Sequence, residues 1–261
     1  MSKTELIKKI VQKKEFSGLP KRDVKLVFEK FDNENNSDEE KIKFTRKTLR
    51  KIFSSFTSRK ILILKNKNEE WVLKKHLSSR ERFPYYLEVY KRIFKNTTQN
   101  LSVIDLGAGV NGFSYNYFKK LGLNVNYLAI EAIKQLTDLM NHYFKDKKIH
   151  GKSFHLSLLE LEKIKKIINT TKEPRVVFLF KTIDSLEILE RNYSKKLISE
   201  VAPLADLFVI SFATKSMMKK RKFKANRNWI IDFLKNNFEI LDDFQTDYER
   251  YLVFRAISKH L

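Results

Sequence analysis

Residues 103–112 read VIDLGAGVNG, and this stretch holds half of the chain's six glycines: Gly107, Gly109 and Gly112. The glycines follow an apolar run that ends around Asp105. A backbone that turns sharply at the end of a strand, close to a ligand, has no room for Cβ atoms. The spacing also matches the G-x-G-x-x-G pattern of nucleotide-binding sheets, which is a weak signal when taken alone. We therefore expect a ligand-binding turn between a strand and a helix.

Strand-like segments alternate with helical ones after this point. We predict strands at 101–106, 124–131, 153–158, 175–180, 204–212, 238–245 and 249–257. Continuous apolar runs such as VVFLF, residues 176–180, are typical of parallel strands covered on both faces. Only the turn TDY, residues 246–248, separates the last two strands, so these must form an antiparallel hairpin. The pattern predicts an α/β fold with five parallel strands and a C-terminal antiparallel hairpin.

The first hundred residues have helical patterns instead. Ser2 and Glu5 have the spacing of a capping box, and further helices are predicted at 20–31 and 83–95. Another helix has apolar residues on one face from Ile42 to Phe56, and we interpret ILIL at 61–64 as its continuation. We expect a helical domain over residues 1–98 and an α/β domain over residues 99–261.

Composition excludes several kinds of site. The chain of 261 residues has no cysteine, so disulfides, thiolate zinc sites and cysteine nucleophiles are ruled out. Its five histidines are scattered without ligand spacing, and we expect no metal site. The N-terminus does not resemble a secretory signal, and no stretch is long and apolar enough for a membrane span. We therefore expect a soluble, cytoplasmic protein.

The net charge of +22 has two explanations. Lysine can be abundant throughout a proteome, or the protein can have a polyanionic partner such as RNA. Residues 215–228, KSMMKKRKFKANRN, contain seven basic residues and no acidic one, and a uniform excess of lysine does not explain that cluster. A membrane surface fits less well, because no basic amphipathic helix accompanies the cluster. The distribution favours a nucleic acid.

The acidic residues at two predicted strand ends distinguish between ligands. Asp105 precedes the first glycine by two residues, and its carboxylate would repel the pyrophosphate of a dinucleotide. S-adenosylmethionine carries a sulfonium and an ammonium group, which an acid attracts. Glu131 ends the second strand, where a carboxylate can accept hydrogen bonds from ribose hydroxyls. The pair favours a class I methyltransferase over a dehydrogenase, and the alternative is a tight turn that binds nothing.

A closer resemblance lies in HLSSRER, residues 76–82, which resembles the H-x-S-x-x-E-R motif of the aminoglycoside-resistance 16S rRNA (guanine-N7) methyltransferases. Further segments resemble the same family in the same order. They are VIDLGAG (103–109), FLFK (178–181), FVISFATKSMMKKRK (208–222), NWIIDFL (228–234) and YLVF (251–254). The resemblance covers most of the chain. It implies a Rossmann-like class I methyltransferase with a seven-stranded sheet, preceded by a helical domain that docks on rRNA.

The resemblance also implies residue roles. The residues expected to bind S-adenosylmethionine are His76, Ser78, Glu81, Arg82, Asp105, Gly107, Gly109 and Glu131. Arg82 is expected to pair with the methionyl carboxylate, and Lys181 and Ser211 to act by positioning. The residues expected to contact RNA are Lys215, Ser216, Lys219, Lys220, Arg221 and Lys222. The chain departs from the family around its third predicted strand, which offers no clear acidic residue for the adenine amino group.

The expected substrate is a guanine near the decoding site of 16S rRNA, and the expected partner is the small ribosomal subunit, bound by a monomer. Guanine N7 has a free lone pair and no proton, so its methylation requires positioning and no general base. The sequence shows no histidine–carboxylate or serine–histidine pattern, which is consistent with such a target. Two alternatives stay open: a methyltransferase of the same fold that acts on another RNA or a protein, and a non-catalytic RNA-binding module.

Overall fold

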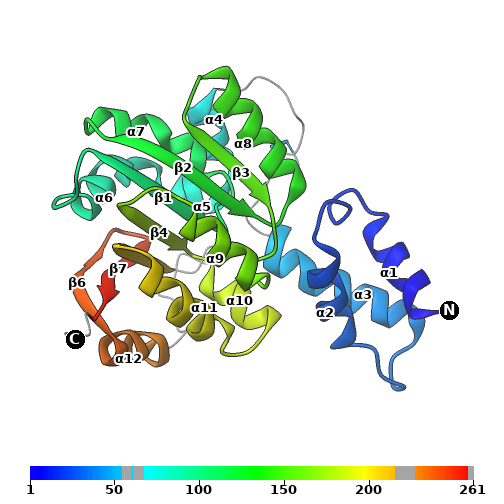
Figure 1. Ribbon diagram of the computed structural model, residues 1–261. Coiled ribbons are helices and arrows are strands. Elements are labelled where there is room, and N and C mark those ends of the chain that lie inside the picture. Colours follow the sequence, from blue (N-terminus) through cyan, green and yellow to red (C-terminus); the bar gives the residue numbers. More distant parts are fainter. Residues whose placement is uncertain (55–59, 62–67, 215–226, 258–261) are drawn as a thin grey trace.

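The computed structural model describes residues 1–54, 60–61, 68–214 and 227–257. In these residues seven strands form one mixed sheet in the order β3-β2-β1-β4-β5-β7-β6 (Figure 1). The strands are β1 (Asn100–Leu106), β2 (Asn124–Glu131), β3 (Gly151–His155), β4 (Arg175–Phe180), β5 (Leu207–Ala213), β6 (Phe238–Gln245) and β7 (Glu249–Ala256). β1 to β5 are parallel, and β7 runs antiparallel to both β5 and β6. The predicted α/β sheet with its C-terminal hairpin is confirmed.

The strand order positions the glycine turn. β1 pairs with β2 on one side and with β4 on the other, so the chain leaves β1 and β4 toward opposite halves of the sheet. In such sheets a crevice opens at the carboxyl ends of the strands where the order reverses. Asp105 and the glycine turn lie at this end of β1.

Helices cover both faces of the sheet. They are α7 (Tyr115–Lys120), α8 (Lys134–Asp146), α9 (Leu161–Asn169), α10 (Ile183–Leu189), α11 (Tyr193–Val201) and α12 (Asn228–Asn237). Successive residues of β1 enter different cores because strand side chains alternate between faces. Val103 packs in the core that includes α7 and α8, whereas Ile104 packs in the core that includes α9, α11 and α12. The two cores fix the strand ends that carry the site.

The helices before the sheet form two groups (Figure 1). A lobe beside the sheet contains α1 (Lys3–Val11), α2 (Lys21–Glu29) and α3 (Asp38–Leu49), whereas α4 (Glu69–Lys75), α5 (Leu77–Arg82) and α6 (Tyr86–Ile93) lie against the sheet. α1 begins with the predicted capping box, in which Ser2 and Glu5 exchange side chain-to-backbone hydrogen bonds. α6 buries Tyr90 and Ile93 in the core that the sheet shares. The division into domains after residue 98 stays a prediction.

The helix predicted to continue past Phe56 is shorter in the structure. α3 ends at Leu49, and a single π-helical turn follows at Arg50–Ser54. Ile61 lies in a turn and not in a helix, and residues 62–64 lie outside the described residues. The predicted helical continuation is therefore wrong at Ile61. An apolar run of four residues does not distinguish a helix from a turn that is buried by its neighbours.

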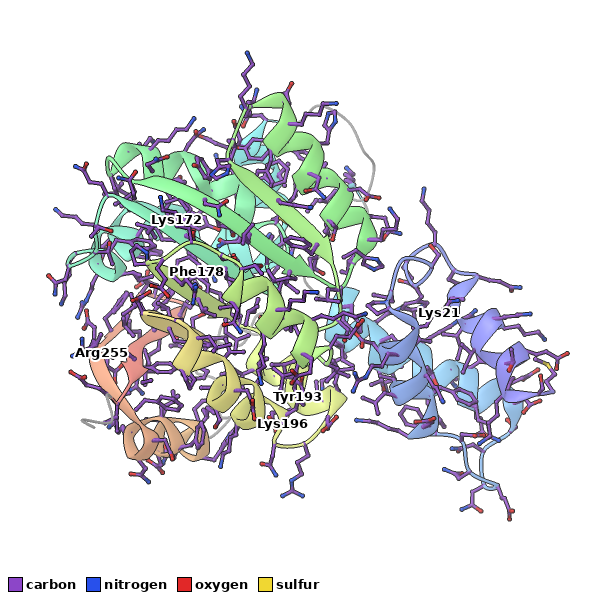
Figure 2. The ribbon with its side chains drawn as sticks, viewed as in Figure 1. Lys21, Lys172, Phe178, Tyr193, Lys196 and Arg255 are labelled. Carbon is purple, nitrogen blue, oxygen red and sulfur yellow. The ribbon has the colours of Figure 1, made fainter. Side chains whose placement is uncertain are left out.

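The surface is basic in many places. Phe178 is buried in the sheet, while Lys21, Lys196 and Arg255 lie exposed on separate elements and Lys172 lies exposed in the loop before β4 (Figure 2). In the part of the chain that the structure describes, no helix is long and apolar enough to cross a membrane.

Candidate cofactor-binding site

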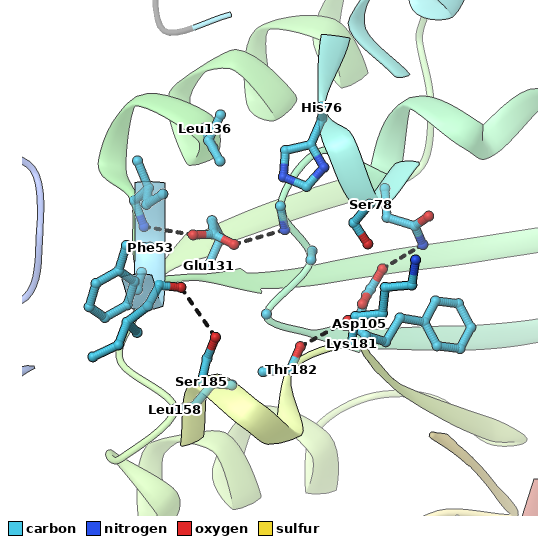
Figure 3. Close-up of a pocket in the computed structure, with 18 of the residues that line it drawn as sticks. Phe53, His76, Ser78, Asp105, Glu131, Leu136, Leu158, Lys181, Thr182 and Ser185 are labelled. Carbon is cyan, nitrogen blue, oxygen red and sulfur yellow. Dashed lines mark hydrogen bonds between the residues drawn. The ribbon is translucent and has the colours of Figure 1, made fainter. Parts of the chain in front are cut away.

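A pocket lies at the carboxyl ends of β1, β2 and β4 (Figure 3). Its walls come from the glycine turn, α5, the loop after β2 and the start of α10. Figure 3 shows Phe53 near one end, Asp105 and Lys181 near the other, and Glu131 between them. The sequence motifs, which are distant along the chain, therefore meet in one place.

Two glycines of the turn have backbone conformations that disfavour side chains. Gly107 has φ +73° and Gly109 has φ +57°. A Cβ on Gly107 would lie 2.8 Å from Thr182 Oγ1, and a Cβ on Gly109 would lie 3.0 Å from His76 Cε1. The glycine turn thus packs closely between the start of α5 and the loop after β4. Side chains at these two positions have no room, as the sequence predicted.

Glu131 holds this turn in place. Its carboxylate accepts the backbone N–H of Gly109 and that of Ile133, each at 2.8 Å (Figure 3). Its side chain is buried, and burial raises the pKa of its carboxyl group. Glu131 therefore connects the loops after β1 and β2 at the middle of the pocket.

Asp105 has neutral partners only. Asn111 Nδ2 donates to its Oδ2 at 2.8 Å, and the Tyr127 hydroxyl donates to the same oxygen. Burial raises the pKa of the Asp105 carboxyl group. Within the described ranges no lysine or arginine forms an ion pair with Asp105, so its negative charge is available to a cationic ligand.

Arg82 has a protein carboxylate as its main partner. Its Nη2 lies 2.6 Å from Glu249 Oε1 and its Nε lies 3.2 Å from Oε2, a two-point contact. Nε also donates to the Tyr251 hydroxyl, and Nη1 donates to Asn111 Oδ1 at 3.1 Å. These bonds fix the orientation of the guanidinium, and Arg82 also lines the pocket.

Lys181 and Ser211 extend the same network. Lys181 Nζ lies 2.6 Å from Glu81 and 3.4 Å from Glu249, and its side chain is almost fully buried. Ser211 donates its hydroxyl hydrogen to Glu249 and accepts the backbone N–H of Lys181 at 3.1 Å. Burial alone would raise the pKa of Glu249, but Arg82 and Lys181 hold it below its usual value. The charges of both cations are thus matched inside the protein.

His76 and Ser78 form the wall above the glycine turn. Both are buried, and His76 Nδ1 lies 3.3 Å from the Ser79 hydroxyl oxygen. Burial, with the positive charges of Arg82 and Lys181, lowers the pKa of His76 to about 3. His76 is therefore a neutral side chain at physiological pH.

Most of the predicted cofactor residues line the pocket. Those that do are His76, Ser78, Arg82, Asp105, Gly107, Gly109 and Glu131. Lys181, which is expected to act by positioning, also lines it. Glu81 and Ser211 lie behind Lys181 and reach the site through it. The residues predicted to bind RNA lie outside the described residues: Lys215, Ser216, Lys219, Lys220, Arg221 and Lys222.

Sequence reasoning missed Asn111 and Glu249. Asn111 joins Asp105 to Arg82 and also accepts the Tyr86 hydroxyl at 2.8 Å, and its position inside the glycine turn was the one available signal. Glu249 begins β7 and offered no motif.

The charge pattern fits a cationic cofactor. The two basic side chains in the pocket are neutralised by Glu81 and Glu249, whereas Asp105 and Glu131 lie unpaired with cations in the described residues. A dinucleotide would bring its pyrophosphate next to these carboxylates. A sulfonium and an ammonium group would meet opposite charge there.

No protein-family model matches this sequence. A 16S rRNA (guanine(1405)-N(7))-methyltransferase of Proteus mirabilis is 31% identical over 71 residues, which are 27% of this chain and 25% of that protein. The enzyme of the same name from Micromonospora rosea is 27% identical over 150 residues, 56% of this chain and 50% of that protein. The matched part therefore spans a quarter to a half of these curated relatives.

The fold is similar over a much longer stretch. The 16S rRNA methyltransferase RmtF, solved in complex with S-adenosyl-L-homocysteine, is 17% identical with a TM-score of 0.78, over 98% of this chain and 100% of that one. The chain thus has the Rossmann-like fold of class I S-adenosylmethionine-dependent methyltransferases, and the resemblance to 16S rRNA (guanine-N7) methyltransferases that its motifs predicted is confirmed.

Proposed function

We propose that this protein transfers a methyl group from S-adenosylmethionine to the N7 atom of a guanine in 16S rRNA. One observation carries the proposal: His76, Ser78 and Arg82 of the H-x-S-x-x-E-R segment line the same pocket as Asp105 and Glu131. The sequence segment that is specific to the family thus contributes to the wall of a pocket suited to a cationic cofactor. The printed names of both curated relatives agree with this activity.

Different residues of the pocket would bind different parts of the cofactor. Asp105 attracts the ammonium group at the methionyl end, and the guanidinium of Arg82 binds the adjacent carboxylate. Glu131 accepts hydrogen bonds from the ribose hydroxyls in addition to the backbone bonds that it already accepts. S-adenosylmethionine supplies a methyl group bound to a positively charged sulfur.

The transfer needs little from the protein beyond alignment. The lone pair of guanine N7 forms the new bond to carbon while the carbon–sulfur bond breaks, and no proton moves. The positive charge passes from sulfur to the purine. Lys181 lines the pocket, and its Nζ lies 2.6 Å from the Glu81 carboxylate. Lys181 therefore acts as a fixed wall against the guanine and not as a general base.

RNA would be brought to this pocket by charge. The cluster at 215–222 carries five basic side chains, and such clusters bind phosphate by displacing counterions. The N7 edge faces the deep, narrow major groove of A-form RNA, so the target nucleotide must leave its helix to reach the pocket. We propose that α1 to α3 assist docking on the small subunit, in the cytoplasm, and that one chain suffices, because the described pocket is built from one chain.

A labelling experiment tests the proposal. Small subunits that lack the modification are incubated with the protein and methyl-labelled S-adenosylmethionine, and the rRNA is then cleaved chemically at 7-methylguanosine. The Asp105→Asn variant and heat-treated protein serve as controls. We expect one labelled guanine near the decoding site, at least about a hundredfold less label with Asp105→Asn, and none with heat-treated protein.

Label in transfer RNA or protein, with none in small subunits, would favour a methyltransferase of the same fold that acts on another substrate. Cofactor binding with no methylated product in any of these fractions would favour a non-catalytic module.

A further inference from the structure

Asp23 is an acidic residue of the N-terminal lobe that lines the cofactor pocket. It lies on the buried face of α2 beside Val24 and Val27, and only 1% of it is exposed. In the parts of the chain that the structure covers, no lysine or arginine forms an ion pair with it. A buried carboxylate without a cation is costly unless another group compensates it, so its presence here requires an explanation.

One of its oxygens has a protein donor. The hydroxyl of Ser157, two residues past the end of β3, donates to Asp23 Oδ1. The same hydroxyl oxygen accepts the backbone N–H of Leu159 at 3.1 Å, which fixes its orientation. The other carboxylate oxygen, Oδ2, receives no donor from the described residues and can accept a hydrogen bond from a ligand.

The place of Asp23 in the pocket indicates which part of a ligand it would meet. Glu131 lies at the middle of the pocket, with Asp105 and Lys181 toward the polar end (Figure 3). The lining near Phe53 includes Leu136 and Leu158, with Ser185, whose hydroxyl donates to the Ile52 carbonyl (Figure 3). Further apolar residues of the lining are Ile52, Ile133, Leu186 and Leu189. A flat purine base suits this apolar part of the pocket. If the ribose of S-adenosylmethionine lies at Glu131 and its methionyl chain at Asp105, the adenine points toward that part.

We propose that Asp23 accepts a hydrogen bond from the exocyclic amino group of adenine, which makes α2 of the N-terminal lobe part of the cofactor site. The inference rests on the proposed use of S-adenosylmethionine. It also accounts for a departure seen in the sequence, where the region of the third strand offers no acid for this amino group. In this chain Ser157 lies in that region, and its hydroxyl donates to Asp23 of α2, which is the acidic residue that would bind the amino group.

Neighbouring contacts hold α2 at the required place. Gly18, just before α2, accepts the backbone N–H of Lys134 at 3.1 Å through its carbonyl oxygen. The same carbonyl lies 2.9 Å from His155 Nε2, which also lies 3.0 Å from the carbonyl of Ala132 in the pocket wall. Asp23 is therefore positioned by the same loops that form the pocket.

The test compares two ligands that differ at one edge of the base. S-inosylhomocysteine has a carbonyl oxygen where S-adenosylhomocysteine has the amino group. It therefore lacks the amino group whose hydrogen bond Asp23 would accept. Dissociation constants for both are measured by calorimetry with the wild-type chain and with Asp23→Asn and Asp23→Ala. Glu29→Gln, an exposed position on the same helix, is the matched control.

We expect the wild type and Glu29→Gln to prefer the adenosyl ligand by at least about tenfold. Asp23→Asn should narrow or reverse the preference, because its amide can donate to the carbonyl, and Asp23→Ala should abolish it. An unchanged preference in both Asp23 variants would overturn this inference alone. A wild-type chain that binds neither ligand would overturn the proposed function as well.

Discussion

The guanidinium of Arg82, at the end of α5, lies 2.6 Å from the carboxylate of Glu249, at the start of β7, and neither side chain is more than 2% exposed. This buried pair attaches the H-x-S-x-x-E-R segment to the C-terminal hairpin. The arginine of the motif therefore has a structural partner in addition to any ligand, and the two roles can be separated by experiment.

Arg82→Ala should lower the free energy of unfolding by about 3–5 kcal/mol, because it leaves Glu249 buried with a weaker set of partners. Arg82→Lys keeps the charge but loses the two-point contact, and should cost less. Denaturant unfolding at pH 7 measures both. A loss below about 0.5 kcal/mol for Arg82→Ala would show that the pair does not stabilise the fold.

His76 should make the protein sensitive to acid. Its folded pKa of about 3 lies below the unfolded value of 6.5, so its contribution to stability is complete above pH 6.5 and is lost as pH falls. The slope should approach about 1.4 kcal/mol per pH unit between roughly pH 6 and pH 4. Unfolding curves for wild type and His76→Asn, recorded from pH 7.5 to pH 4.5, give the difference. A His76 ring that titrates near pH 6.5 by NMR would contradict this expectation.

Asp23 should have an effect of opposite sign. Burial raises its folded pKa from 3.8 to about 6, despite the hydrogen bond from Ser157 that lowers it. Its ionisation therefore destabilises the fold as pH rises through 6. Relative to wild type, Asp23→Asn should gain up to about 3 kcal/mol between pH 3.8 and about pH 6, and no more from pH 6 to pH 8. Thermal and denaturant unfolding of the two chains across this range measure the gain, and a difference independent of pH would refute the assignment.

Glu131→Ala should weaken S-adenosylmethionine binding by at least about tenfold, since it removes a ribose acceptor and frees the glycine turn. The backbone amides of Gly109 and Ile133, which now donate to Glu131, should exchange faster with deuterium. The exposed Glu162→Ala is the control. Unchanged exchange at both amides would mean that Glu131 does not hold the turn.

Replacing Lys219, Lys220, Arg221 and Lys222 with glutamate should abolish binding to small subunits and leave cofactor affinity unchanged, because clustered charge acts on the polyanion. Reversal of four exposed lysines elsewhere, Lys119, Lys120, Lys145 and Lys147, is the matched control. Filter binding at several salt concentrations distinguishes the two. Equal losses in both variants would indicate that net charge matters more than the cluster.

The sequence predicted the parts of the site that depend on consecutive residues. Strand ends and glycine spacing predicted that Asp105, the glycine turn and Glu131 belong to the site. Each of them lies at the carboxyl end of β1 or β2. A hydrophobic pattern shows which residues are buried and does not show which element packs on which. Arg82 and Glu249 are 167 residues apart, and Asp23 and Ser157 are 134 apart. These two contacts, and the network around Asn111, needed the three-dimensional structure.

Calorimetric titration with S-adenosylmethionine and with NAD⁺ shows whether the pocket binds a positively charged sulfur cofactor or a dinucleotide. We predict saturable binding of S-adenosylmethionine at one site per chain, weakened by Asp105→Asn, and no binding of NAD⁺. Binding of NAD⁺, or no binding of S-adenosylmethionine by the folded wild-type chain, would contradict the account.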